Sequence, residues 1–139
     1  MNDLRDIDLP WVAVDAGGRL AVFTTAGEGP VPASALRVST AAEAAVAQLP
    51  IVGGNELLAK YLRPDDFIAF AERGLYAYDW SDAHRSGSDC TRCYELVAKP
   101  LRPVSIGELP EGLRFPFEAT VIAGASFGQP RVALSHIAT

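Results

Sequence analysis

The sequence has few of the residues that most often build metal centres and nucleophilic active sites. Its 139 residues include only two cysteines and two histidines. The single Cys-x-x-Cys has no second copy and no histidine pair stands at ligand spacing, so the common zinc-domain patterns are excluded. Hydrolase, zincin, kinase and P-loop signatures are missing as well. We therefore expect no cofactor and favour a non-catalytic protein over an enzyme.

Positive charge is also scarce. Twelve Lys and Arg residues stand against seventeen Asp and Glu, which gives a formal net charge of −5 and a pI near 4.9. Such a surface repels phosphate backbones, because their binding depends on Lys and Arg displacing counterions. Nucleic acids and anionic membranes are therefore not expected as partners, whereas a basic protein surface would be attracted. The alternative is that mild acidity only keeps the protein soluble.

No apolar run approaches the length of about 18 residues that a bilayer span needs. The first ten residues, "MNDLRDIDLP", lack the basic and apolar regions of a secretory signal. These absences predict a cytoplasmic protein, in which the two cysteines are reduced. The composition is that of an ordinary globular protein, with 49% hydrophobic and 21% charged residues. Its length predicts a single domain, residues 1–139, with no internal repeat or linker.

The first half of the chain predicts a hairpin followed by helices. Residues 11–15 and 19–25 are β-prone, and Gly17-Gly18 between them suits a tight turn. A helix is predicted from Thr40 to Pro50, since Thr40 and Glu43 have the spacing of a capping box. Residues 55–62, "NELLAKYL", suggest one or two further helical turns. A helix over 64–74 has Pro at its first turn and Gly74 at its end.

The second half predicts strands. Residues 75–80 and 93–100 alternate in polarity with a period of two, and the polar residues 81–92 form a long loop between them. Residues 118–125 and 131–137 resemble a closing pair of strands, although a helix is possible for the second. We therefore predict an α+β fold: a mostly antiparallel sheet of hairpins, with two or three short helices packed on one face.

The stretch from Tyr78 to Val97 contains the candidate chemical groups. His84, Cys90 and Cys93 could supply three zinc ligands, with His136 or Asp89 as a fourth. A redox role is less favoured, because Cys93 opens a strand instead of a helix. Two ordinary cysteines, one in a loop and one half-buried, are the simpler interpretation.

Carboxylates in the same stretch suggest two further alternatives. Asp79, Asp82 and His84 could act as a general acid and base, provided that a pocket shifts their pKa values. More simply, Asp79 and Asp82 are turn-forming residues at the end of a strand.

Three aromatic residues, Tyr76, Tyr78 and Trp80, share one side of a predicted strand. As core residues they would pack beneath a covering element. As exposed residues they would form a recognition patch, because Tyr and Trp dominate interface hot spots. With Asp79, Asp82 and Glu95 nearby, such a patch would suit a basic partner.

Three segments resemble those of small, largely uncharacterised bacterial cytoplasmic proteins. They are "LPWVAVDAGGRLAVFTTAGEGPVP" (residues 9–32), "GLYAYDWSD" (74–82) and "YELVAKP" (94–100). Some proteins of that kind resemble immunity proteins, which neutralise a toxin delivered between competing bacteria. The resemblance implies an inhibitor without catalysis or cofactor, which binds a basic toxin and occludes its active site. The alternative is a small enzyme or zinc-dependent domain centred on residues 79–93.

Overall fold

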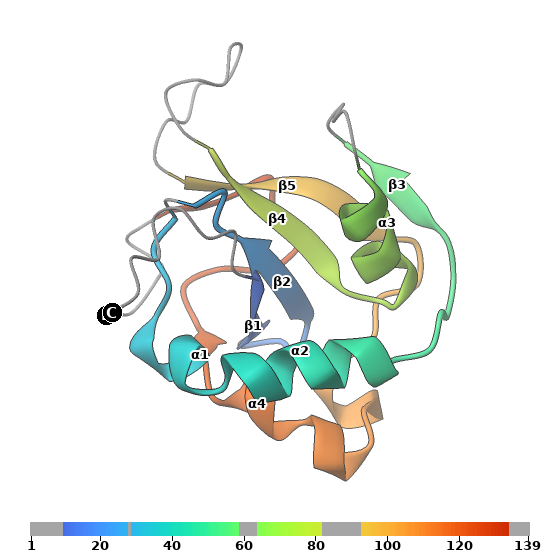
Figure 1. Ribbon diagram of the computed structural model, residues 1–139. Helices are drawn as coiled ribbons and strands as arrows, with labels where there is room; N and C mark the ends of the chain where they lie inside the picture. Colours follow the sequence, from blue (N-terminus) through green and yellow to red (C-terminus); the bar gives the residue numbers. More distant parts are fainter. Residues whose placement is uncertain (1–9, 28, 59–63, 82–92, 134–139) are drawn as a thin grey trace.

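The structure is a computed structural model that describes residues 10–27, 29–58, 64–81 and 93–133 (Figure 1). It has the predicted α+β fold, with one mixed sheet and helices packed on it. The strands are β1 (Pro10–Asp15), β2 (Leu20–Thr24), β3 (Asn55–Leu57), β4 (Tyr76–Ser81), β5 (Cys93–Pro100), β6 (Val121–Ile122) and β7 (Arg131–Ala133). The helices are α1 (Ala33–Arg37), α2 (Ser39–Gln48), α3 (Asp65–Glu72) and α4 (Phe115–Glu118), with 3₁₀ turns η2 (Ile106–Glu108) and η3 (Glu111–Leu113).

The sheet is mostly antiparallel. Its strand order is β3-β5-β4-β2-β1-β6, and β7 pairs with β5 as well. The β1–β2, β4–β5, β3–β5 and β5–β7 pairs are antiparallel, whereas β2–β4 and β1–β6 are parallel. The parallel β2–β4 pair joins the first half of the chain to the second.

Two predicted hairpins are confirmed. β1 and β2 pair from Pro10↔Thr24 to Val14↔Leu20, and Gly18 in the turn has a φ of 85°. That left-handed conformation favours glycine, because a Cβ atom is strained there. β4 and β5 are antiparallel neighbours, as their alternation predicted. The loop expected between them falls mostly outside the described residues.

Several local predictions were wrong. Residues 55–57 form strand β3 instead of a helix, because pairing with β5 decides their conformation. The described parts of the two closing segments, up to residue 133, do not pair with each other, since β6 pairs with β1 and β7 with β5. The helix predicted from Thr40 begins at Ser39 and has no side-chain cap, so the capping box is absent there. Helices α1 and α4 were not predicted.

The central strands are buried on both faces, and the two faces differ in composition. One face, here called the aromatic face, holds Trp11, Phe23, Tyr78, Trp80, Tyr94 and Phe127. Trp11 stacks on Phe23 with ring centroids 4.2 Å apart, and its indole N–H donates to the Tyr94 hydroxyl at 3.1 Å. Tyr94 in turn donates to the Pro30 carbonyl at 2.9 Å. The hydrogen bonds satisfy the polar groups that these large rings take into the core.

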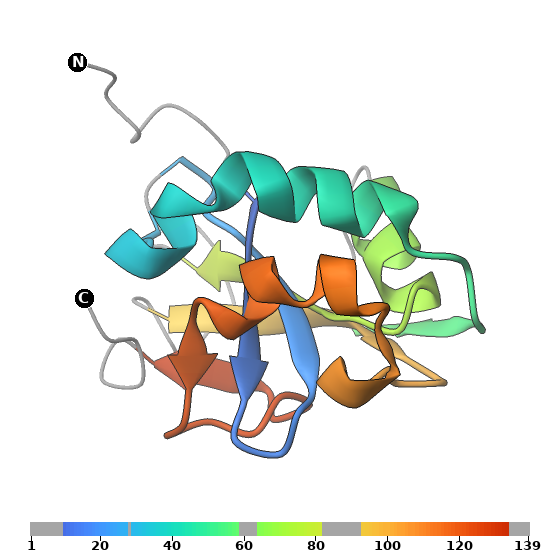
Figure 2. The same cartoon turned by 90° about the horizontal axis from the view of Figure 1, so that it is seen from below.

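The opposite face, here called the helical face, is covered by α2, α3 and α4. Helices α2 and α4 lie next to each other against β1, and α3 lies against β3, β4 and β5 (Figures 1 and 2). Valine and leucine side chains of β1 and β2 pack there on Ala42, Ala45 and Phe117. Among the described residues, no helix is long and apolar enough to cross a bilayer. The predicted placement of helices on one face holds for α2, α3 and α4.

We predict that Gly74→Ala lowers the free energy of unfolding by about 2 to 4 kcal/mol. Gly74 has a φ of 91°, and a Cβ atom would lie 2.9 Å from the Val104 backbone nitrogen. Urea denaturation measures the change. Gly112→Ala is the matched control, because no atom lies within 4 Å of its Cβ position and the expected change is within about 0.5 kcal/mol. Equal effects of the two substitutions would contradict the packing at Gly74.

Candidate functional site

The aromatic stripe of β4 lies in the core. Tyr78 is 0% exposed and Trp80 5%, and both pack in the aromatic face. The recognition patch proposed from the sequence is therefore wrong for these two residues, because a buried ring offers no surface to a partner. Tyr76 is partly buried and packs against the same cluster. The period of two placed the three rings correctly on one side but left open what covers them.

Asp79 is also buried, at 5% exposure. Its carboxylate accepts a hydrogen bond from the Thr24 hydroxyl at 2.6 Å, and its cross-strand neighbour on β5 is Glu95. Because Asp79 lies inside β4, it is not the turn-forming residue that we expected. Glu95 remains partly exposed and is in register with Arg131 of β7. Asp82, the remaining acid of the predicted patch, lies outside the described residues.

The candidate metal ligands are only partly described. Cys93 is fully buried and disulfide-bonded, in contrast to the expected reduced state. A disulfide sulfur is not a thiolate, so Cys93 does not present the form that binds zinc. His84, Cys90, Asp89 and His136 lie outside the described residues. Among the residues that are described, no group of three His, Cys, Asp or Glu side chains is placed to hold a metal ion.

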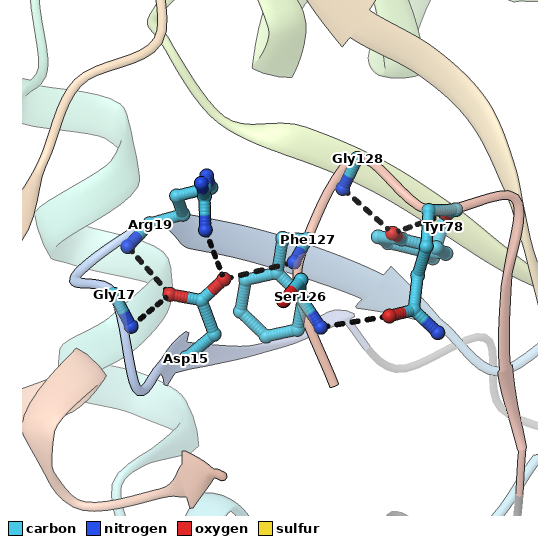
Figure 3. A network of polar contacts seen from close by, with 8 residues as sticks. Asp15, Gly17, Arg19, Tyr78, Ser126, Phe127 and Gly128 are labelled. Atoms are coloured by element: carbon cyan, nitrogen blue, oxygen red, sulfur yellow. Dashed lines mark hydrogen bonds and ion pairs between the residues drawn. The ribbon is translucent and has the colours of Figure 1, made fainter. Parts of the chain in front are cut away.

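A polar network at the rim of the aromatic face provides hydrogen-bond partners for the buried polar groups of Tyr78 and Asp15 (Figure 3). The Asp15 carboxylate accepts hydrogen bonds from the backbone N–H groups of Gly17 at 2.9 Å, Arg19 at 2.8 Å and Phe127 at 2.8 Å. It also pairs with the Arg19 guanidinium at 3.3 Å. These contacts satisfy both oxygens, so Asp15 is a structural residue and not a candidate base.

Tyr78 holds the turn at residues 126–129, which also contains the Phe127 N–H bonded to Asp15. Its hydroxyl donates to the Gln129 carbonyl at 2.7 Å and accepts from the Gly128 N–H at 3.0 Å (Figure 3). Burial, the largest effect, raises the pKa of Tyr78 well above the usual value of 10.0. The phenol therefore stays protonated at neutral pH and acts as a fixed donor.

A cavity lies on the helical face, between α2 and α3. We call it the cleft. It has a volume of about 560 Å³, within the range of about 300 to 1,000 Å³ that is usual for ligand pockets. Its lining is mostly apolar: Pro10, Val12, Val22, Ala42, Glu43, Val46, Ala47, Ala69, Phe70 and Arg73.

The cleft forms because the two helices cover different strands. α2 packs on β1, and α3 packs on β3, β4 and β5. Val12 of β1 and Val22 of β2 form the floor of the cleft. The alanines of α2 and α3 that face each other across it are too small to fill the space between the helices. Val12 and Val22 are themselves buried, so the accessible apolar surface of the cleft belongs to its helix walls, at Val46, Ala47 and Phe70.

Charge is distributed unequally along the cleft. Arg73 stands where α3 meets the end of α2, since its guanidinium donates to the carbonyls of Leu49 at 3.1 Å and Ala69 at 3.0 Å. Glu43 is exposed on the α2 wall. Asp66 lies on the same helical stripe as Ala69 and about 10 Å from Arg73 along α3. The lining therefore carries one acid, Glu43, and one cation, Arg73, while Asp66 lies beyond the lining on α3.

Sequence reasoning missed the cleft, although its wall residues lie in helices that were predicted. A weak signal was present in the alanines of α2, which fill little space between packed helices. The spacing between α2 and α3 depends on tertiary packing, which no local pattern encodes.

No protein-family model matches the chain, and comparisons with curated proteins and with solved structures give no match either. The functional inference therefore depends on the geometry of the chain itself.

We predict that Tyr78→Phe lowers the free energy of unfolding at pH 7 by about 1 to 3 kcal/mol, since the Gly128 N–H and the Gln129 carbonyl lose their partner. The difference between the two proteins should shrink above about pH 10. There the tyrosine ionises in the unfolded chain while burial keeps it protonated in the folded one, so the native contribution is lost as pH rises. Urea denaturation of both proteins between pH 7 and 11 measures this. A difference that stays constant over that range would contradict the assignment.

Proposed function

We propose that this chain is a non-catalytic protein-binding module, most concretely an immunity-type inhibitor that binds a basic toxin and occludes it. The observation that carries the proposal is the cleft, a mostly apolar groove with the exposed acid Glu43 on its α2 wall, in a protein of net charge −5. It replaces the buried β4 residues as the binding surface. The resemblance of residues 9–32, 74–82 and 94–100 to immunity-type proteins points to the same class.

The shape and lining of the cleft favour a helical segment of the partner. Two helix walls and a strand floor form a groove, and amphipathic helices bind such grooves through apolar residues at i, i+3, i+4 and i+7. Val46, Ala47 and Phe70, whose side chains are partly or fully exposed on the walls, supply the apolar contact. A helix diameter of about 10 Å would leave the polar side of the partner segment at the rim of the groove.

The rim charge selects a basic segment. Glu43 is exposed on the α2 wall and Asp66 is exposed on α3 beyond the lining, whereas the guanidinium of Arg73 is hydrogen-bonded to two backbone carbonyls. Lys or Arg on the polar side of a bound helix would meet these acids, while acidic residues would be repelled. Because exposed charges are screened by salt, association should slow as ionic strength rises. Inhibition then needs no chemistry, since the bound segment is no longer available to the partner's own substrate.

A synthetic peptide tests the groove directly. The probe is an 18-residue amphipathic peptide with Leu on one face and Lys on the other, and its counterpart has Glu in place of Lys. We expect the lysine peptide to bind at least about tenfold more tightly than the glutamate peptide, and more weakly at high salt. Fluorescence anisotropy at two salt concentrations measures both peptides.

Two matched tryptophan variants locate the binding. Ala47→Trp places an indole in the cleft, whereas Ala44→Trp places one on an exposed position of α2 outside it. We expect at least about tenfold weaker peptide binding for Ala47→Trp, because a filled groove loses its apolar contact, and no change for Ala44→Trp. Equal binding by both variants would show that the peptide binds elsewhere and would overturn the assignment of the cleft.

A further inference from the structure

Arg73 is unusual because it is a partly buried cation held by backbone atoms alone. A guanidinium has five N–H donors, and two nitrogens of Arg73 donate to the Leu49 and Ala69 carbonyls. No carboxylate of the described residues forms an ion pair with it. Arginine that is withdrawn from water is normally paired with an acid. The remaining N–H groups thus form a preorganised donor set for an anion.

A second cavity lies next to this donor set. It has a volume of about 300 Å³ and is distinct from the cleft, although Arg73 lines both. Its lining consists of Leu49, Pro50, Val52, Arg73, Arg102, Val104, Glu108, Leu109 and Pro110. Two of the three charged residues are therefore arginines, and the remaining residues are apolar.

The single acid of this lining has partners in its own turn. The carboxylate of Glu108 accepts hydrogen bonds from the backbone N–H of Ser105 at 2.9 Å and from its hydroxyl at 3.1 Å. These bonds hold Glu108 in the capping box of η2. The two arginines leave the lining with a net positive charge, and the charge of the exposed Arg102 also acts on the Glu108 carboxyl.

We propose that this second cavity binds a small carboxylate ligand with an apolar body. The carboxylate lies between Arg73 and Arg102, since guanidinium groups match carboxylate geometry with paired hydrogen bonds. The apolar body packs against Leu49, Val52, Val104 and Leu109. A volume of about 300 Å³ lies at the small end of ligand pockets, which favours a short branched or aromatic acid over a long chain. This site is separate from the helix-binding cleft, although Arg73 lines both cavities.

Matched acids and amides test the ligand class. The probes are 4-methylpentanoate and phenylacetate, and the controls are the corresponding primary amides, which have the same apolar bodies without the charge. We expect the acids to bind with a Kd of about 1 mM, as suits ligands of this size, and the amides at least about tenfold more weakly. Titration followed by ¹H–¹⁵N spectra measures the affinity and shows which backbone amides respond. Equal binding of acid and amide would overturn the proposal.

Charge variants locate the site. Arg102→Gln removes a cation from the cavity, and Arg37→Gln removes one from the exposed end of α1, so both change the net charge equally. We expect about tenfold weaker binding of the acids for Arg102→Gln, and unchanged binding for Arg37→Gln and for Ala47→Trp in the cleft. Equal losses in the two arginine variants would show a non-specific charge effect and overturn the site. Both arginines are exposed, so the variants should keep the melting temperature of the parent.

Discussion

The carboxylate of Asp15 joins parts of the chain that are 112 positions apart in sequence, and the rest of the structure depends on that link. It fixes the turn of the first hairpin through Gly17 and Arg19 and holds the N–H of Phe127 on the other side. The turn at 126–129 is thereby placed over the rings of Phe23 and Tyr78. Since buried N–H groups need acceptors, a buried carboxylate with four donors is a strong constraint on both segments.

Because the aromatic face is covered, the binding surface that we propose lies on the opposite, helical face. The stacked and edge-on rings leave no ring of that cluster more than slightly exposed, and the hydroxyls of Tyr78 and Tyr94 are bonded to backbone atoms. On the helical face the coverage is incomplete, because α2 and α3 are short and pack on different strands. The cleft therefore lies between two helices that cover different strands of a sheet that is apolar on both sides.

The sequence predicted what local patterns control and missed what distant pairing controls. The β1–β2 hairpin, the β4–β5 pair and helix α3 were predicted, because turn glycines, alternation and helix-end residues act over a few positions. Residues 55–57 have helical propensity, but the edge of β5 draws them into a strand. The alternation of polarity predicted that Tyr78 and Trp80 share one side of β4, but it did not predict that residues between 122 and 132 pack on that side. The cleft follows from the spacing of α2 and α3, and the second cavity from the packing of loop residues beyond α2 and around η2. Composition supplied only the expectation of a basic partner.

Arg73 determines how costly binding at the cleft would be. Its two bonds tie the end of α2 to α3 with no ligand bound, so the groove is already formed. A partner segment would then bind without first ordering the receptor, which removes one of the main costs of association. Rim charges such as Glu43 would act mainly on the association rate, whereas apolar contact with Val46, Ala47 and Phe70 would control the lifetime of the complex. An inhibitor that must capture its target quickly and hold it would benefit from such a preformed groove, in which charges control the association rate and apolar contacts control the lifetime of the complex.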